Sequence, residues 1–385
     1  MKRIILFICR LLVGVLFIFS GLIKANDPLG FGYKLVEYFE VFHMLFLADY
    51  ATAMAILLCA LEMILGAALL LGIRPVQVAW GLLLLIIFFT FLTFYSAFFD
   101  VVKTCGCFGD AIPLTPWQSF TKDLVLLLLI VVIFVNRKSI RPAITNPKAE
   151  RASLWIISIL SAGFGLYTLN FLPVMDFLPY KTGLNIPDQM KVPAGAPLDV
   201  FEITYTLKHK KTGENKVMTD KEYLKTGIWK DDNWEIIGEP VNKLIKKGFE
   251  PKIRDLKITD VQGTDYTTEI IGNPYYNLVI VANSLEKADV RAIGDLNALA
   301  INAAENYNIR TVVLTSTSPT GADAFKKRHK LVMEIFNADD VPLKSMVRAN
   351  PGLILLKNGT VINKWHYHRL PSYDELEKNY FSKTP

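Results

Sequence analysis

Five long apolar stretches occupy most of the first 172 residues of the chain. Each has about the 20 residues that an α-helix needs to cross the hydrocarbon core of a bilayer. The hydrophobic residues, 52% of a 385-residue chain, are concentrated there, so this half is not expected to fold as a soluble domain. The predicted spans are Ile4 to Ile23, Leu47 to Leu71, Val76 to Phe99, Trp117 to Val135 and Leu154 to Leu172. The first lacks a clear small-residue cleavage site, and we interpret it as an uncleaved anchor.

Lysine and arginine indicate the orientation of the spans, because these residues are retained on the cytoplasmic side. The N-terminus, the turn with Arg74 and the basic segment between the fourth and fifth spans all fall on one side if the spans alternate. We therefore predict a bacterial plasma-membrane protein with a cytoplasmic N-terminus and everything after Pro173 in the periplasm. The lipid bilayer is the expected partner. The net charge of +6 is explained by this topology, so nucleic acid is not an expected partner.

Two of the four cysteines lie together in the segment Cys105-Gly106-Cys107-Phe108-Gly109, in the predicted outer loop between the third and fourth spans. That compartment is oxidising. In an extended segment the two Cα atoms would be about 6.5 to 7 Å apart, near the upper limit for a disulfide, and strained disulfides are oxidising and labile. Cys105 and Cys107 are thus candidates for a redox pair. The alternatives are a structural disulfide or idle thiols; two ligands are too few for a zinc site, and no metal is predicted.

Several charged residues interrupt the apolar stretches, where burial is costly. Arg10 lies about 9 Å along the first span and Glu62 about 15 Å from the inner end of the second, so the two are candidates for an ion pair. Together with Lys24 they indicate either a proton or quinone site or a structural ion pair. Lys122 and Asp123 enter the fourth span near the cysteine loop. Lys122 is a candidate for stabilising a thiolate, with Asp123 beside it, or for reaching toward the lipid headgroups.

The region after the fifth span has the pattern of an exported soluble half. A linker rich in proline and glycine precedes a hairpin and a capping box at Thr219, within a small mixed segment of unassigned role. From residue 251 onward the predicted order is strand, helix, strand, helix, strand, strand, helix. The predicted divisions of the chain are 1–137, 138–180, 181–250 and 251–385.

The segment from Arg348 to Gly359, with Asn350-Pro351-Gly352 before an apolar strand and Lys357-Asn358-Gly359 at a hairpin, resembles thioredoxin. The resemblance implies that Pro351 is the cis-proline of a thioredoxin-like domain. Where that family has Cys-x-x-Cys, this chain has Ser284-Leu285-Glu286-Lys287. Without sulfur the domain cannot exchange disulfides itself, so we interpret it as a binding or docking domain.

The first half carries a second resemblance. Arg10-Leu11-Leu12-Val13-Gly14, Ser20-Gly21 with Lys24, and Glu62 with Gly66 are similar to the four-helix DoxX family. The cysteine loop is similar to that of its MauE branch. This resemblance implies disulfide formation or electron transfer during the maturation of exported proteins. The fifth span and the thioredoxin-like tail extend beyond the MauE pattern.

The expected fold class is therefore a multi-pass α-helical membrane bundle, DoxX-like with one added span, followed by an extracytoplasmic α/β thioredoxin-like domain. The leading hypothesis is a thiol-disulfide oxidoreductase that relays electrons between an exported protein client and a membrane acceptor such as a quinone. The first alternative is a non-enzymatic scaffold or assembly factor, and the second is a transporter that uses Arg10 and Glu62. No nucleotide-binding or hydrolase motif is present, and the sequence predicts no oligomeric state.

Overall fold

The computed structural model describes residues 2–102, 106, 108–246 and 248–382. Cys105 and Cys107 lie outside the described residues. Within the described part, five helices are long and apolar enough to cross a membrane, which confirms the prediction of five spans. These helices are α1 (Lys2–Asn26), α3 (Ala51–Leu71), α4 (Pro75–Phe99), α5 (Pro116–Val135) and α6 (Pro147–Asn170).

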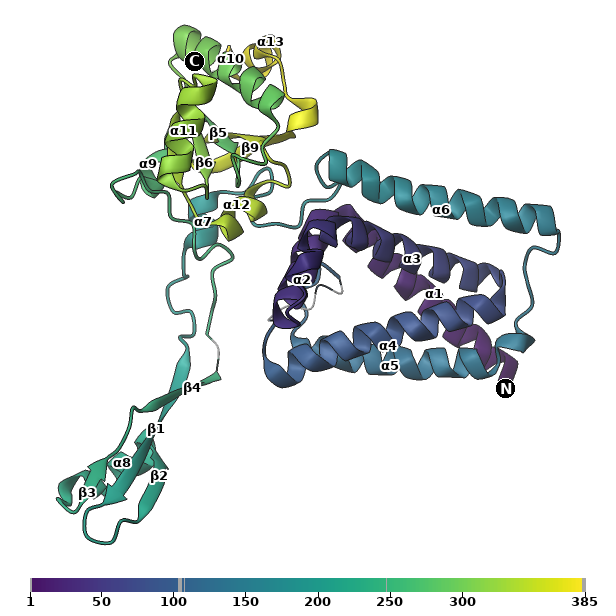
Figure 1. Cartoon of the computed structure of the whole chain (residues 1–385), viewed down its shortest axis with the longest axis horizontal. Coiled ribbons are helices and arrows are strands. Elements are labelled where there is room, and N and C mark those ends of the chain that lie inside the picture. Colours follow the sequence, from purple (N-terminus) through teal and green to yellow (C-terminus); the bar gives the residue numbers. More distant parts are fainter. Residues whose placement is uncertain (1, 103–105, 107, 247, 383–385) are drawn as a thin grey trace. The chain divides into compact units, whose positions relative to one another are not determined.

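The membrane bundle is built from paired helices. Figure 1 shows α1 along α3, α4 along α5, and α6 along α3. Small residues allow the closest pair, since a Cβ on Gly66 would lie 2.7 Å from the backbone oxygen of Gly14. Fully buried Val13, Leu82 and Ile130 belong to one apolar core shared by α1, α4 and α5. Many other apolar side chains on these helices are exposed, as expected of surfaces that face lipid.

A helix that the sequence analysis did not predict follows the first span. The helix α2 (Pro28–Val41) begins at the N-cap Asp27, whose Oδ1 accepts a hydrogen bond from Gly30 N at 2.9 Å. Proline occupies its first position. A 3₁₀ helix, η1 (Leu45–Tyr50), then leads into α3. The segment between the first two spans is thus mostly helical rather than an open loop.

Residues Ile186–Asp255 form a compact unit of their own. Its sheet has the order β2-β1-β3, with β4 also paired to β1. The predicted hairpin is confirmed by β1 (Val200–His209) and β2 (Asn215–Thr219), and the predicted capping box opens α8 (Asp220–Thr226). The unit also contains α7 (Ile186–Met190), η3 (Ile228–Lys230), β3 (Trp234–Ile236) and β4 (Val241–Lys246).

The C-terminal α/β domain contains a mixed sheet with the order β7-β6-β5-β8-β9. Strands β5, β6 and β7 pair in parallel, and β8 pairs antiparallel with both β5 and β9. Its strands are β5 (Tyr276–Val281), β6 (Arg310–Thr315), β7 (Glu334–Asn337), β8 (Gly352–Lys357) and β9 (Thr360–His366). Its helices are α9 (Thr267–Ile271), α10 (Val290–Tyr307), α11 (Pro319–His329), α12 (Asp340–Met346) and α13 (Tyr373–Leu376), followed by a π-helical turn at Glu377–Phe381.

The core of this domain lies between the sheet and α10, where Ile293 and Leu296 pack with Leu278 and Leu355. The predicted order of elements omitted α9, β7 and α12. All three are short, and a strand of four residues or a helix of five or seven is too brief for a hydrophobic period to be recognised. The omission matters, because α12 ends directly before the cis-proline loop.

Candidate functional site

The Asn350–Pro351 peptide bond is cis, the geometry expected from the sequence. It lies in a loop between α12 and β8. The side chain of Asn350 donates a hydrogen bond through Nδ2 to the backbone oxygen of Ser284 at 2.8 Å. The cis-proline loop is thus bonded to the segment Ser284-Leu285-Glu286-Lys287, which follows β5.

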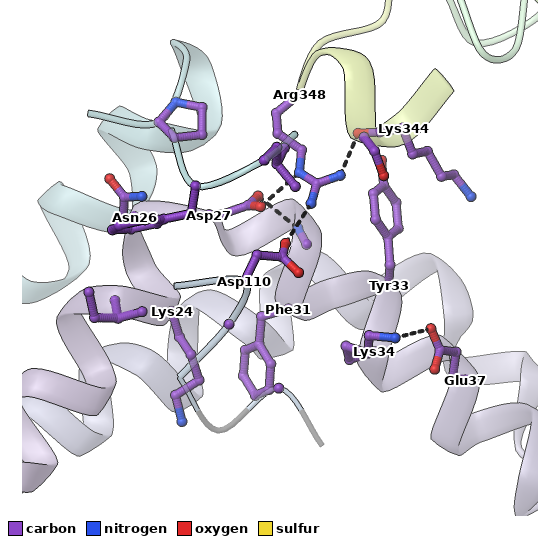
Figure 2. A pocket seen from close by; sticks show the side chains of 18 of the residues that line it. Lys24, Asn26, Asp27, Phe31, Tyr33, Lys34, Glu37, Asp110, Lys344 and Arg348 are labelled. Carbon is purple, nitrogen blue, oxygen red and sulfur yellow. Dashed lines mark hydrogen bonds and ion pairs between the residues drawn. The ribbon is translucent and has the colours of Figure 1, made fainter. Parts of the chain in front are cut away.

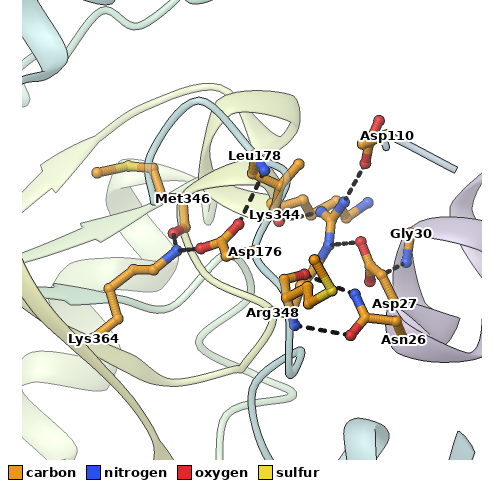
Figure 3. A network of polar contacts seen from close by, with 11 residues as sticks. Asn26, Asp27, Gly30, Asp110, Asp176, Leu178, Lys344, Met346, Arg348 and Lys364 are labelled. Atoms are coloured by element: carbon orange, nitrogen blue, oxygen red, sulfur yellow. Dashed lines mark hydrogen bonds and ion pairs between the residues drawn. The ribbon is translucent and has the colours of Figure 1, made fainter. Parts of the chain in front are cut away.

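Arg348, three residues before the cis-proline, is a buried cation with carboxylate partners from the first half of the chain. Its side chain is 6% exposed, and its Nε donates to Asp27 Oδ2 at 2.7 Å. Its Nη2 donates to Asp110 Oδ2 at 3.3 Å, and its Nη1 donates to the backbone oxygen of Lys344. Figure 3 shows the guanidinium between these groups. Because Asp110 directly follows Gly109, the end of the cysteine loop and the cis-proline loop meet at Arg348.

Burial and the charges around Arg348 shift several pKa values. Burial disfavours the charged guanidinium, but Asp27 and Asp110 outweigh it, so the pKa of Arg348 is raised. Burial raises the pKa of Asp110, with Asp27 adding to the rise and Arg348 opposing it. Burial also raises the pKa of Tyr33 to about 12. The ring of this tyrosine lies 5.6 Å from the Arg348 guanidinium and 4.5 Å from Lys344 Nζ.

Further polar contacts hold the same region together. Asn26 Nδ2 donates to the backbone oxygen of Met175 at 2.7 Å, and Met175 N donates back to Asn26 Oδ1 at 3.0 Å. Lys364 on β9 forms an ion pair with Asp176 and donates to Met346 O at 3.2 Å. Burial lowers the pKa of Lys364, and Asp176 opposes that effect. The segment after α6 is therefore bonded both to the end of α1 and to the C-terminal domain.

A cavity of about 550 Å³ opens beside Arg348. Figure 2 shows Tyr33, Lys34 and Glu37 of α2 on one side and Lys344 and Arg348 on the other. The ammonium of Lys34 lies 2.6 Å from a carboxylate oxygen of Glu37. The wall also includes residues from the cysteine loop and from the segment after β5: Gly106, Gly109, Asp110 and Lys287. The volume is in the range of ligand-binding pockets, and the wall carries side chains of both charges.

Two glycines of the cysteine loop, Gly106 and Gly109, are hydrogen-bonded to each other. Gly109 N donates to Gly106 O at 3.1 Å, and both glycines have positive φ, +66° for Gly106 and +52° for Gly109. These values lie in the left-handed region, where glycine is favoured because it has no Cβ. The ring of Phe108 turns toward the bundle, with its centroid 5.7 Å from the ring of Phe19 and 5.4 Å from Lys122 Nζ.

Lys122 and Asp123 lie together near the start of α5. Lys122 forms an ion pair with Asp123 and has a 23% exposed side chain. Asp123 is buried and accepts a hydrogen bond from Thr93 Oγ1 at 3.0 Å. The predicted tuning of a thiolate by Lys122 stays a prediction, because both thiols lie outside the described residues.

The buried carboxylate of Glu62 pairs with Lys24, with side chains 2% and 3% exposed. The expected pairing of Glu62 with Arg10 is wrong. Arg10 donates through Nη2 to the backbone oxygens of Leu69 at 3.0 Å and Leu70 at 3.2 Å, at the C-terminal end of α3. Because α1 and α3 are antiparallel, Arg10 is level with Leu70, about 12 Å along α3 from Glu62, and binds the helix end where cations are favoured.

The Lys24–Glu62 and Lys122–Asp123 ion pairs border one small buried chamber of about 40 Å³. Phe108 and Phe89 also line it. Lys24 Nζ lies 4.7 Å from the centroid of the Phe89 ring. The second carboxylate oxygen of Glu62 has no hydrogen-bond partner among the residues that the structure describes. A mostly apolar chamber that is bordered by two ion pairs therefore lies inside the bundle, against the ring of Phe108.

Arg348, Asp27 and Tyr33 were not predicted as site residues. Asp27-Pro28 is a recognisable helix start, and Arg348 stands inside the motif that was singled out for its proline. Nothing in the sequence around Arg348 or Asp27 indicates that these two residues form an ion pair. No group of three histidine, cysteine or acidic side chains suited to a metal lies within the described ranges.

These features define the class of protein: an integral membrane helical bundle that carries a soluble α/β domain. Residues 2–136 match the family described as methylamine utilisation protein MauE. Protein TlpB of Flavobacterium psychrophilum is 30% identical over 130 residues, which cover 32% of this chain and 35% of that relative. The chain thus matches about a third of the relative's length. No solved structure matches the chain significantly.

Proposed function

We propose that this chain is a thiol-disulfide relay of the bacterial plasma membrane that supports the maturation of exported proteins. In this proposal the N-terminus is cytoplasmic, and the cysteine loop and the C-terminal domain face the periplasm. The MauE match over residues 2–136 supports a redox role for the bundle, in line with its resemblance to the DoxX family.

In the same proposal residues 251–385 form a thioredoxin-like domain that binds the client. Two observations support it: the cis bond before Pro351, and the parallel β5 and β6 beside antiparallel β8 and β9. The domain has no cysteine, so its role is to hold a client polypeptide rather than to oxidise it. Residues 1–137 then form the catalytic bundle, 138–180 the basic cytoplasmic loop with the fifth span, and 181–250 a segment without an assigned role.

The observation that carries the proposal is the pairing of Asp110 with Arg348. Asp110 is three residues after Cys107, and Arg348 is three residues before Pro351. Gly106, between the two cysteines, lines the same cavity as Lys287 and Arg348. A polypeptide held at the cis-proline loop is therefore near the cysteine loop. This arrangement provides proximity, which accelerates a reaction between two bound groups.

The chemistry balances with a quinone as the final oxidant. A client thiolate attacks the disulfide between Cys105 and Cys107 and forms a mixed disulfide. The second client thiolate then attacks the mixed disulfide and releases the loop cysteine. The client now has a disulfide, and both loop cysteines are thiols. Two electrons and two protons then pass from these thiols to a quinone, which becomes a quinol, and the loop disulfide forms again. Lys122 favours the thiolate form in this cycle.

Thiol trapping in intact membranes tests the proposal. We expect Cys105 and Cys107 to be a mixture of oxidised and reduced forms that moves toward the reduced form when quinone is depleted. In a Cys107→Ser variant the Cys105 thiolate should attack a disulfide of the oxidised client, and the client should be retained as a mixed disulfide because the second loop thiol is missing. The matched control is Cys9→Ser, which changes a buried cysteine of α1.

The alternative function is a non-enzymatic scaffold. It is favoured by the ion pairs of Arg348 with Asp27 and of Lys364 with Asp176, which bind the C-terminal domain to earlier segments without any cysteine. A redox state of the two loop cysteines that does not respond to quinone, with full function of Cys107→Ser, would contradict the relay and support the scaffold.

A further inference from the structure

A groove on the lipid-facing surface lies between α1 and α5, with a volume of about 580 Å³. Leu12 and Leu16 line it from α1, and Trp117, Gln118, Lys122 and Val125 are among the residues that line it from α5. Both helices are membrane spans, and Leu12 and Val125 are 46% and 53% exposed. The volume is in the range of small-molecule sites.

The groove is polar at one end and apolar along the rest. Gln118 and Lys122 belong to the first two turns of α5, next to Trp117, a residue type that favours the membrane interface. Thr121 also lines this end, and its hydroxyl donates to the backbone oxygen of Trp117 at 2.9 Å. The remaining wall is formed by leucine and valine side chains. This distribution fits a molecule with a small polar head and a long apolar tail. A head with carbonyl oxygens suits it well, because the Gln118 amide and the Lys122 ammonium are hydrogen-bond donors.

The polar end of the groove adjoins the buried chamber. Leu16, Lys122 and Leu126 line both spaces. Lys122 pairs with Asp123, and across the chamber Glu62 has a carboxylate oxygen with no partner among the described side chains and backbone groups. The chamber, at about 40 Å³, has room for a few water molecules but not for a ring. Water there would connect the two ion pairs.

The geometry points to the groove between α1 and α5 as the binding site of a lipid-soluble quinone, with its ring at Gln118 and Lys122 and its tail along Leu12, Leu16 and Val125. The inference rests on the proposed function for the choice of ligand. Phe108, which follows Cys107, lies against Lys122 and brings the cysteine loop to this end. The two thiols supply two electrons and two protons, and the quinone accepts both as it becomes a quinol. The Lys122–Asp123 and Lys24–Glu62 pairs pass the protons through the chamber.

Quenching of Trp117 fluorescence measures the binding directly. The detergent-solubilised full chain is titrated with a short-chain benzoquinone, and the signal of Trp117→Phe is subtracted to remove the other tryptophans. We expect saturable quenching. Val125→Phe fills the groove and should weaken binding at least tenfold, whereas Leu128→Phe makes the same kind of change at a 68% exposed position outside the groove lining and should not. Equal affinities in these two variants overturn the inference. Quenching that never saturates also overturns it, because that is the behaviour of a quinone that only partitions into the detergent or replaces an ordinary lipid chain.

The proton path has its own readout. The double variant Lys24→Met/Glu62→Gln removes both charges of the buried pair and should leave quinone binding within twofold while slowing quinol formation about tenfold. A rate equal to that of the unsubstituted protein removes the Lys24–Glu62 pair from the path.

The site and the proposed function can fail separately. Saturable binding in a Cys105→Ser/Cys107→Ser variant supports the site even if the thiols prove idle. The redox state of the loop thiols after quinone depletion is also compared between Val125→Phe and the unsubstituted protein. An equal response in both proteins supports the relay but overturns the groove as the quinone site.

Discussion

Arg348 Nε lies 2.7 Å from Asp27 Oδ2 and joins residues 321 positions apart in the chain. Asp27 is the N-cap of α2, directly after the first span, and Arg348 lies in the loop that contains the cis-proline. A third group, Asp110, brings the end of the cysteine loop to the same guanidinium. One buried cation therefore links the three segments on which the proposed function depends.

Replacement of Arg348 by alanine should release the C-terminal domain from the bundle. It leaves the half-buried Asp27 without its cation, and breaking such a pair costs about 3 kcal/mol. We expect faster proteolysis of the segment after α6 and slower reoxidation of the loop thiols. The control is Arg310→Ala in the same domain, which breaks more exposed pairs with Glu269 and Glu334 and should cost about 1 kcal/mol or less. Equal effects of the two variants would contradict the role of Arg348.

The Lys24–Glu62 pair should behave as a unit. Lys24→Met alone leaves a buried carboxylate without its partner and should lower the stability of the bundle by roughly 3 to 5 kcal/mol. The double variant Lys24→Met/Glu62→Leu removes both charges and should recover most of that loss. Thermal unfolding in detergent measures the difference. A double variant as unstable as the sum of the two single variants would show that the side chains do not interact.

Gly66 should not tolerate a methyl group. A Cβ there would lie 2.7 Å from Gly14 O and 2.9 Å from Ile18 Cγ1, so α1 and α3 must move apart. The expected cost of Gly66→Ala is about 2 kcal/mol, measured as a lower unfolding temperature in detergent. Gly163→Ala on α6 is the matched control, because a Cβ there meets nothing within 4 Å. Equal unfolding temperatures of the two variants would contradict the requirement for glycine at the contact between α1 and α3.

The C-terminal domain should lose stability as the pH falls from about 6.5 to about 4. Burial lowers the pKa of His366 from 6.5 to about 4, with a smaller contribution from His368. Between these values the unfolded state binds a proton that the folded state does not bind, so stability rises with pH and is complete above about 6.5. The full effect is roughly 3 kcal/mol.

Pulse proteolysis across this pH range measures the change. His366→Gln should flatten the dependence, while His329→Gln, which changes a partly exposed histidine of the same domain, should leave it as it is. An NMR titration that finds His366 protonated at pH 6 would refute the explanation.

Local signals predicted most of the long elements of secondary structure. The five spans follow from apolar stretches of membrane length, and the hairpin between β8 and β9 follows from the Asn358-Gly359 turn. The cis bond at Pro351 was expected from a motif of a few residues. The helix α2 was not predicted although Asp27-Pro28 marks its start, because it lies between two much longer apolar stretches. The strand β7 and the helix α12 are too short to show a period.

The polar partners were decided by packing. Depth along separate spans made Arg10 a plausible partner of Glu62, but the antiparallel contact of α1 with α3 places Lys24 within reach of Glu62 and Arg10 at the end of α3. The same holds for Arg348, whose carboxylate partners come from the end of the first span and from the cysteine loop.

The amino-acid order alone determined that the chain is a five-span membrane protein with a cysteine pair in one loop and an α/β domain after the last span, since chain length, hydropathy and turn chemistry are local properties. Only the tertiary structure decided that Arg348 binds Asp27 and Asp110 and that Glu62 binds Lys24. An ion pair depends on side-chain reach across a packed interface, and helices separated by tens or hundreds of residues set that distance without leaving a mark in the sequence between them.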